Sequence, residues 1–297
     1  MKTLVCHPNF KYLQEILGEK YWYKVPNIDF LAFPDSWPNY FINEVQEDIY
    51  KKEIIYIWDF SKKENLFENY AIIRWILDYS ADKLDVFVPY FPTWQMDRIS
   101  KQWDIVTAKY FADIFSNLPS WLSFKTTIHL FDIHSLNIIF YFDHFKVNTI
   151  LHSCMNLIKK EINKDFVIVF PDEWAYKRFA CDFSQYETII CFKIRKWDEK
   201  EIVIKEWNPT WKDIIIIDDL IQSWWTIIET AKLLKSKWAK SINAFAVHWI
   251  FPKNKNFINL ASHLDNLYIT DTIPENITKT KDIKNIKILS FSNLGIF

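Results

Sequence analysis

Short runs of apolar residues alternate along the chain with segments whose apolar positions recur every three or four residues. The runs predict eight β-strands, at residues 54–58, 84–88, 127–131, 166–170, 188–192, 213–217, 242–247 and 267–269. The helical period predicts five helices, at residues 65–79, 104–115, 151–162, 174–183 and 226–237. Strands that alternate with helices indicate an α/β fold. The run 214–217 consists of four isoleucines, which is typical of a parallel strand buried on both faces.

Length and composition describe a globular protein of two domains. The 297 residues suit two domains of about 150 residues each. We place the boundary near residue 148, which gives domains 1–148 and 149–297. Half of the residues are hydrophobic and a quarter are charged, which excludes a disordered or fibrous chain. The net charge of -1 gives no support to a nucleic-acid or anionic-membrane binder.

The cysteines and the first residues indicate the compartment. No C-x-x-C pair occurs among Cys6, Cys154, Cys181 and Cys191, so neither a zinc site nor a redox dithiol is expected. Free thiols suit a reducing cytoplasm. The first residues lack the apolar segment of a signal peptide, and no apolar run reaches the length of about 18 residues that spans a membrane. We therefore expect a soluble cytoplasmic protein.

The glycine and tryptophan counts are unusual. Glycine occurs twice and tryptophan fifteen times, whereas ordinary usage is roughly 7% glycine, or about twenty residues. A chain of this length needs glycine for turns with positive φ and for close backbone approaches. Some bacterial lineages read the codon UGA as glycine. We therefore hypothesise that many of the printed tryptophans stand for glycine.

The segment 214–226 carries the clearest chemical signal. A buried strand ends in Asp218 and Asp219, and a short turn then leads into a helix. Carboxylates at this point can accept hydrogen bonds from the hydroxyl groups of a ligand, and backbone N–H groups with the Ser223 and Thr226 hydroxyls can cradle a phosphate at the helix start. The alternative is an ordinary strand-to-helix turn with an acidic cap. With glycine at positions 224 and 225, the segment reads DDLIQSGGT and resembles the phosphoribosyl-binding loop of type I phosphoribosyltransferases.

Further segments extend this resemblance to most of the chain. They lie at residues 88–98, 104–112, 131–143, 170–178, 193–195 and 237–249. Together they resemble the ribose-phosphate diphosphokinase (phosphoribosyl pyrophosphate synthetase) family, between about residues 33 and 289. Tryptophan stands on a family glycine at positions 174, 225 and 238, and also at 224, which supports the recoding hypothesis; Trp75, inside a helical pattern, is interpreted as a true tryptophan.

The resemblance implies a fold and a reaction. The fold would be two phosphoribosyltransferase-like domains, each a mostly parallel sheet flanked by helices, with the active site between them. The first domain would be the ATP side and the second the ribose 5-phosphate side, and the last residues could return to the first domain. The enzyme would transfer the diphosphoryl group of ATP to the C1 hydroxyl of ribose 5-phosphate, and would assemble as at least a dimer.

The resemblance also implies roles for individual residues. Lys193 and Arg195 would clamp the transferring phosphates, and His134 and Asp172 would bind Mg²⁺. The ribose 5-phosphate site would comprise Asp218, Asp219, Gln222, Ser223, Trp224, Trp225 and Thr226. The ATP site would comprise Phe33, Asp35, Trp37, Gln95 and Met96. Without the resemblance, we would interpret His134 and Phe33 as structural residues. We would interpret Lys193 and Arg195 as solvated basic residues near a strand end.

Four departures from the family pattern leave alternatives open. Gln95 and Met96 stand where the family has Arg-Gln, Trp37 stands for Glu, and Gln222 replaces an acid. Loss of the arginine removes a charge-assisted phosphate contact of about 1.5–3 kcal/mol. One alternative is a non-catalytic regulatory paralogue, and another is a phosphoribosyltransferase of nucleotide salvage.

Overall fold

The computed structural model describes residues 1–119, 124–196, 199–204, 209–222, 225–250 and 262–297. They form two compact units. Unit 1 comprises Met1–Ser153 with Gly295–Phe297, and unit 2 comprises Cys154–Leu294. The expected boundary near residue 148 lies within a strand of unit 1. No helix in the described ranges is long and apolar enough to cross a membrane.

Unit 1 is a parallel five-stranded sheet with a separate hairpin. The sheet has the order β1-β4-β5-β6-β7, with strands Thr3–Cys6, Glu53–Ile57, Lys83–Val88, Thr126–Phe131 and Val147–His152. The antiparallel hairpin consists of β2 (Ile28–Ala32) and β3 (Pro38–Ile42). The helices are α1 (Lys11–Tyr21), α2 (Val45–Asp48), α3 (Asn65–Asp78) and α4 (Thr107–Ser116), and the 3-10 helices are η1 (Pro8–Phe10), η2 (Trp94–Met96) and η3 (Leu136–Tyr141).

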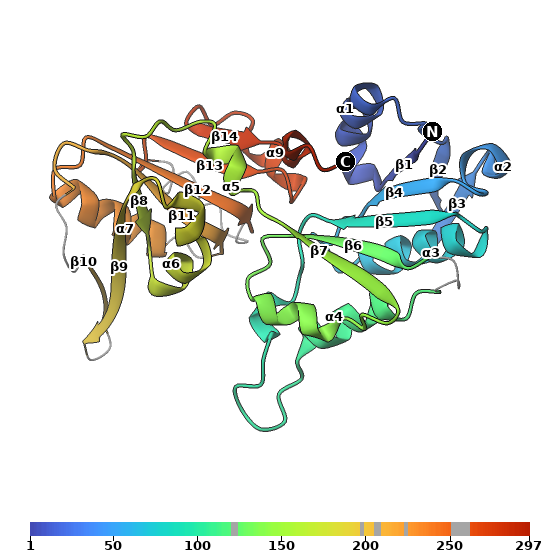
Figure 1. The fold of residues 1–297 in the computed structure, drawn as a ribbon, viewed down its shortest axis with the longest axis horizontal. Coiled ribbons are helices and arrows are strands. Elements are labelled where there is room, and N and C mark those ends of the chain that lie inside the picture. The colour runs from blue at the N-terminus through green and yellow to red at the C-terminus, as the bar shows by residue number, and fades with distance from the viewer. Residues whose placement is uncertain (120–123, 197–198, 205–208, 223–224, 251–261) are drawn as a thin grey trace. The chain divides into compact units, whose positions relative to one another are not determined.

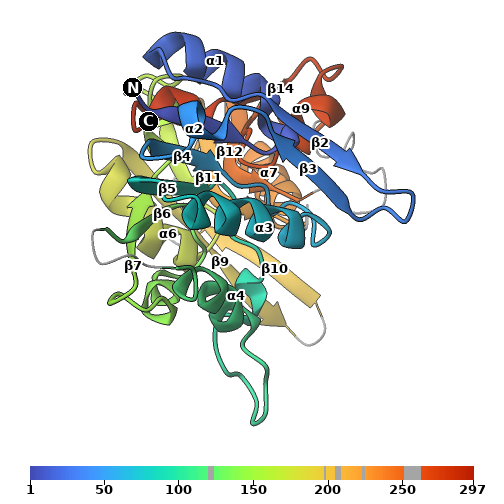
Figure 2. The same ribbon diagram turned by 90° about the vertical axis from the view of Figure 1, so that its right-hand side faces the viewer.

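Apolar side chains hold α3, α4 and the hairpin against one face of this sheet. Ile72 and Ile76 of α3 and Phe111 and Phe115 of α4 are buried in the main core of unit 1. In the hairpin, alternate residues face this core while their neighbours are exposed, as expected of a strand with one buried face. Figure 1 shows α3 and α4 on one side of the sheet and α1 on the other, and Figure 2 shows the two hairpin strands side by side near α3.

Unit 2 is a seven-stranded sheet of order β10-β9-β8-β11-β12-β13-β14. Its strands are Glu199–Ile204, Glu187–Lys196, Val167–Phe170, Asp213–Ile221, Ser241–Trp249, Asn266–Thr270 and Ile286–Leu289 in that order. All neighbours are parallel except β9 and β10. The helices are α5 (Met155–Ile158), α6 (Glu173–Phe179), α7 (Trp225–Ser236) and α9 (Glu275–Thr280), with 3-10 helices η4 (Ala180–Phe183) and η5 (Phe291–Leu294).

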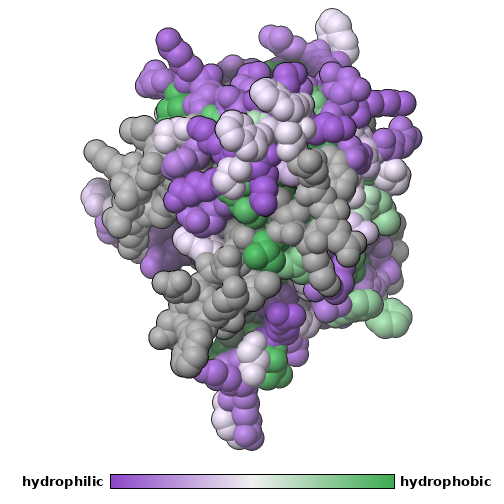
Figure 3. All heavy atoms as spheres, turned by 90° about the vertical axis from the view of Figure 1, so that its left-hand side faces the viewer, coloured by the Kyte–Doolittle hydropathy of each residue, from purple (hydrophilic) through white to green (hydrophobic). Residues whose placement is uncertain are grey.

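The apolar side chains of unit 2 gather in its interior. The isoleucines of β11 at positions 214–217 are fully buried between layers, as the apolar run predicts. The coloured residues of the face drawn in Figure 3 are mostly hydrophilic, with a few small hydrophobic areas among them. This distribution is that of an ordinary globular domain.

The α/β architecture predicted from the sequence is confirmed, and each predicted strand overlaps an observed one. The predicted helix at 104–115 begins only at Thr107, and the helix at 174–183 ends at Phe179 and continues as a 3-10 helix. The prediction of a helix at 151–162 is largely wrong. Residues up to His152 pair with β6, where β-branched side chains such as Val147 and Ile150 favour a strand, and only Met155–Ile158 is helical.

Several tryptophans have a backbone that favours glycine. Nine non-glycine residues in the described ranges have positive φ, and four of them are Trp22, Trp103, Trp211 and Trp238, at 56–75°. Their side chains are 72–86% exposed. Trp22 ends α1 in the left-handed region and donates its N–H to the Gly18 carbonyl, a position where glycine is usual. These conformations support the recoding hypothesis.

Candidate active site

Three aspartates of unit 2 gather at the carboxyl ends of neighbouring parallel strands. Asp172 follows β8, and Asp218 and Asp219 lie near the end of β11, which pairs with β8. Carboxyl ends of parallel strands meet at one edge of a sheet, where α/β proteins bind ligands. The Asp172 carboxylate accepts the Ala175 N–H at 3.0 Å and caps α6. The strand order and this cap therefore fix the position of the acidic group.

The three carboxylates repel one another. The pKa of Asp218 is raised well above its ordinary value by burial first, and then by the charges of Asp219 and Asp172. Asp219 is 5% exposed and donates its backbone N–H to the Asp218 carboxylate at 2.9 Å. A cation or hydroxyl groups placed against this pair would relieve the repulsion.

The donor chemistry of this group suits magnesium. Mg²⁺ takes oxygen ligands, commonly one or two carboxylates together with water and substrate phosphates. Within the described part of the chain, no three His, Cys, Asp or Glu residues are arranged as a complete metal site.

Residues 222–224 separate the end of β11 from the start of α7. Gln222 is exposed at the end of the strand, and α7 begins at Trp225, which is 37% exposed. Thr226 is half-buried in the first turn, while Ser223 and Trp224 lie outside the described residues. The start of this 12-residue helix thus follows the acidic pair closely, and helix N-termini favour anionic groups.

The two predicted catalytic cations lie on β9. Lys193 pairs with Ile202 of β10, and Arg195 pairs with Lys200. The two residues are separated by one position, so they share a face of the strand. Because β9 also pairs with β8, which precedes Asp172, the basic strand neighbours the acidic edge within unit 2.

Three of the predicted ATP-site residues lie on the turn of the hairpin. The Phe33 N–H donates to the Trp37 carbonyl at 2.8 Å, and the Trp37 N–H donates to the Asp35 carboxylate at 3.2 Å. Phe33 is 51% exposed and Trp37 is 58% exposed. The Trp37 ring meets Phe67 of α3 edge-on, with centroids 5.3 Å apart. The hairpin therefore presents an exposed aromatic ring beside a carboxylate.

The other two predicted ATP-site residues and one predicted metal ligand follow the central strands of unit 1. Gln95 and Met96 belong to η2 after β5, and His134 follows β6. The rings of Trp94 and His134 lie 4.8 Å apart, which brings η2 to the predicted metal ligand. His134 belongs to unit 1 and Asp172 to unit 2, so the two predicted metal ligands come from different units.

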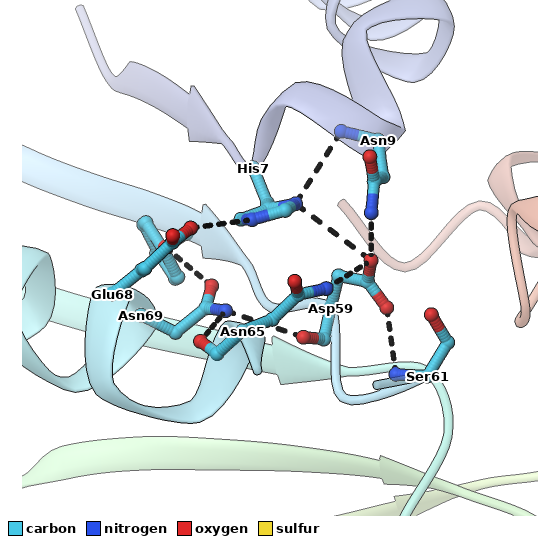
Figure 4. Close-up of polar contacts among 8 residues, drawn as sticks. His7, Asn9, Asp59, Ser61, Asn65, Glu68 and Asn69 are labelled. Atoms are coloured by element: carbon cyan, nitrogen blue, oxygen red, sulfur yellow. Dashed lines mark hydrogen bonds and ion pairs between the residues drawn. The ribbon is translucent and has the colours of Figure 1, made fainter. Parts of the chain in front are cut away.

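Two polar networks at strand ends were not predicted. In unit 2, His248 at the end of β12 lies 2.9 Å from the Thr272 hydroxyl, and His248 is opposite Leu220 in the strand register. In unit 1, His7 follows β1 and faces Asp59, which follows β4, as Figure 4 shows. The sequence does show that these polar residues directly follow buried apolar runs. Their spacing does not show that residues so far apart in sequence lie next to each other.

Comparisons with known proteins agree with this geometry. The family described as "Phosphoribosyl synthetase-associated domain" matches residues 208–295. Ribose-phosphate pyrophosphokinase 4 of Arabidopsis thaliana is 29% identical over 94% of this chain and 86% of that protein. The chloroplastic ribose-phosphate pyrophosphokinase 3 of the same plant is 30% identical over 94% of this chain and 70% of that protein.

A solved structure shares the fold over nearly the whole chain. The phosphoribosylpyrophosphate synthetase of Mycobacterium smegmatis superposes with a TM-score of 0.81 at 19% identity, and the match covers 98% of this chain and 95% of that one. This similarity supports the two-domain phosphoribosyltransferase-like architecture. With the sequence matches, it leads to one conclusion: the chain belongs to the ribose-phosphate pyrophosphokinase family.

Proposed function

We propose that the chain transfers the β,γ-diphosphoryl group of ATP to the C1 hydroxyl of ribose 5-phosphate. The C1 oxygen forms a bond to the β-phosphorus, the bond from that phosphorus to the α-phosphate oxygen breaks, and AMP leaves. The hydroxyl proton is released to solvent. The products are phosphoribosyl pyrophosphate and AMP. The observation that carries the proposal is the acidic pair, half-buried Asp218 and buried Asp219, shortly before the N-terminus of α7.

Each part of the unit 2 edge has a role in this reaction. The two carboxylates hold the ribose hydroxyls, and the segment 222–226 holds the 5-phosphate at the start of α7. Glycine at positions 224 and 225 would let the backbone approach that phosphate closely. Lys193 and Arg195 neutralise charge on the transferring phosphates, which is the main catalytic requirement of phosphoryl transfer.

The nucleotide is assigned to unit 1. Phe33 stacks on the adenine, while Asp35, Trp37, Gln95 and Met96 contact the rest of ATP. As the family resemblance implies, His134 and Asp172 would each be a ligand of Mg²⁺, and the acidic pair would add negative charge near it. When bound, the metal supplies charge neutralisation of the phosphate oxygens. Burial, and after it the charges of Asp219 and Asp172, raise the pKa of Asp218, and a cation at this edge would relieve the repulsion between these carboxylates.

A dimer or a larger assembly in the cytoplasm completes the proposal. Phe41 of the hairpin is 60% exposed and Phe67 of α3 is 54% exposed, and both line an apolar cavity of about 530 Å³. Exposed aromatic residues of this kind suit an interface. Sedimentation of the purified chain tests this part directly, since a monomer at micromolar concentration would contradict it.

A regulatory paralogue is the second candidate. It is favoured by Gln95 and Met96, which provide no cation for the ATP phosphates, and by Gln222 in the phosphate turn. The retained Lys193 and Arg195 argue against it, since a protein without turnover has no need of them.

AMP release from ATP and Mg²⁺, with and without ribose 5-phosphate, separates the two candidates. The proposal predicts release that depends on the sugar phosphate and falls at least about a hundredfold in Lys193→Ala, as is usual when a charge-stabilising group is removed. Lys177→Ala, an exposed residue of α6, is the matched control and should retain activity. A folded wild-type chain with no turnover would favour the regulatory paralogue.

A further inference from the structure

Aromatic rings stack on the side of the unit 1 sheet that faces away from α3 and α4. Val86 and Val88 of β5 belong to the main core, so Phe87 between them faces the other side, where Figure 1 also shows α1 and the end of the chain. The Phe87 ring is nearly parallel to the His129 ring of β6, with centroids 4.1 Å apart and planes at 10°. The Phe297 ring stacks on Phe87 as well, with centroids 4.7 Å apart and planes at 23°. The sheet of unit 1 therefore holds residue 297.

A second imidazole extends this stack toward the end of β7. His129 Nδ1 lies 2.8 Å from His152 Nε2, and the planes of the two rings are within 2° of parallel. His129 Nε2 lies 3.6 Å from the Asp85 carboxylate, which accepts a bond from Lys83 Nζ at 2.8 Å. These polar side chains come from three adjacent strands, β5, β6 and β7. They form a fixed base for the Phe87 ring.

The chain passes between the two units twice, and both connections reach this group of rings. The chain leaves unit 1 after Ser153 and returns to it at Gly295. His152, directly before the first passage, belongs to the imidazole pair, and Phe297, shortly after the second, belongs to the ring stack. Gly295 has a φ of 72°, a conformation that glycine adopts without strain. The second connection is therefore a turn at glycine followed by an aromatic anchor.

Unit 2 holds the other ends of the two connections. After the first passage, Cys154 is fully buried. Before the second passage, Phe291 is fully buried, and its N–H donates to the Asp271 carboxylate at 2.8 Å. The Lys160 amino group, shortly after α5, donates to the Asn293 carbonyl of η5 at 3.4 Å. The two connections are thus fixed beside each other in unit 2 as well.

We propose that Phe297 is a positioning residue, which fixes the second connection to unit 1 by stacking on Phe87 and so limits the relative motion of the two units. Domains within one chain move relative to each other unless something beyond a single linker restrains them. The inference rests on the proposed function, in which His134 of unit 1 and Asp172 of unit 2 would both be ligands of Mg²⁺. Phe297 is assigned no contact with the substrates and acts through the placement of those two residues.

Distances between two spin labels test the restraint without turnover. Cys181 of unit 2 is exposed while the other three cysteines are buried, and Glu64→Cys adds an exposed attachment point in unit 1. Electron–electron double resonance measures the distribution of distances between the labels, and an excess of unlabelled chain removes distances between subunits. Phe297→Ala should broaden this distribution at least about twofold, since the units then lose one of two restraints. Phe297→Tyr retains a ring on Phe87 and should leave the width unchanged.

Kinetics test the positioning role. Phe297→Ala should lower kcat at least about tenfold, because a displacement of about 1 Å at the reacting groups can cost about a hundredfold. The KM for ribose 5-phosphate should stay within about twofold, since that substrate is assigned to unit 2 alone. Phe87→Leu removes the other ring of the stack and should have the same effects, with little further change in the double variant. Phe145→Ala, which truncates an aromatic residue of unit 1 that is 92% exposed, is the matched control and should equal the wild type.

Each outcome decides the proposal. An unchanged distance distribution in Phe297→Ala would overturn it, and so would a broadened distribution with an unchanged kcat. If the wild type has no turnover, the proposed function fails, and the distance distribution alone then supports or overturns the restraint by Phe297.

Discussion

Replacement of the four left-handed tryptophans by glycine should stabilise the protein. Trp22, Trp103, Trp211 and Trp238 have φ between 56° and 75°. In this region the Cβ atom crowds the carbonyl oxygen, at a cost of roughly 1–2 kcal/mol for a residue with a side chain. Glycine is free of this cost, although it loses roughly 0.4–1 kcal/mol through the greater entropy of the unfolded chain.

The expected gain is about 1 kcal/mol at each position. Little packing is lost, because the four side chains are 72–86% exposed. The gains at Trp211 and Trp238 are coupled, since the Trp211 N–H donates to the Trp238 carbonyl at 2.8 Å. The fourfold variant should therefore gain about 3 kcal/mol, somewhat less than a simple sum.

Urea denaturation of each variant measures this gain. Trp75→Gly is the matched control: Trp75 lies inside α3, and its ring is tilted against that of Tyr79 with centroids 4.4 Å apart. There the same change removes packing and places glycine in a helix, so it should destabilise by about 3–5 kcal/mol. If glycine at the four exposed positions lowers the free energy of unfolding, as is expected at Trp75, then positive φ does not destabilise these tryptophans. The backbone conformations would then no longer support the recoding hypothesis.

Further predictions concern the native mass, the acidic pair, a half-buried histidine and the ATP side. The recoding hypothesis predicts a native intact mass below that of a chain with fifteen tryptophans. Because the folded state raises the pKa of Asp218, its charged form destabilises the unliganded protein at neutral pH; Asp218→Asn should raise the urea midpoint at pH 7 and abolish AMP release. Burial, and after it the charge of His129, lower the pKa of His152 to about 4. As the pH is lowered, the unfolded state therefore binds the proton before the folded state does. The free energy of unfolding should decrease as the pH is lowered from about 6.5 to about 4. His152→Asn should flatten that part of a urea titration against pH. Gln95→Arg should lower the KM for ATP about tenfold by adding a charge-assisted contact, and an unchanged KM would remove Gln95 from the site.

Local patterns predicted the central strands and the acidic pair. The four isoleucines before Asp218 indicate a buried strand without any knowledge of its neighbours in the sheet. The acidic residues and the helix follow this strand directly in the sequence, so they could be predicted together. The helix 226–237 was predicted within one residue at each end, because its apolar face is regular. The family assignment depended on the same contiguous segments.

Long-range contacts were beyond the reach of those patterns. The hairpin was not predicted, because its strands are short and Pro38 and exposed polar residues break the apolar pattern. Residues 7, 59 and 68 meet only through the order of parallel strands, which no spacing reveals. Leu151 and its neighbours have an apparent helical period, but they pair with β6 and form a strand.

Phosphorus NMR of one reaction mixture tests the central claim most directly. The chain, with glycine at positions 224 and 225, would be incubated with ATP, Mg²⁺ and ribose 5-phosphate. The account predicts one phosphoribosyl pyrophosphate for each AMP, with neither product formed when the sugar phosphate is omitted. Formation of ADP, or no new resonance from a folded protein, would contradict the assignment of diphosphoryl transfer.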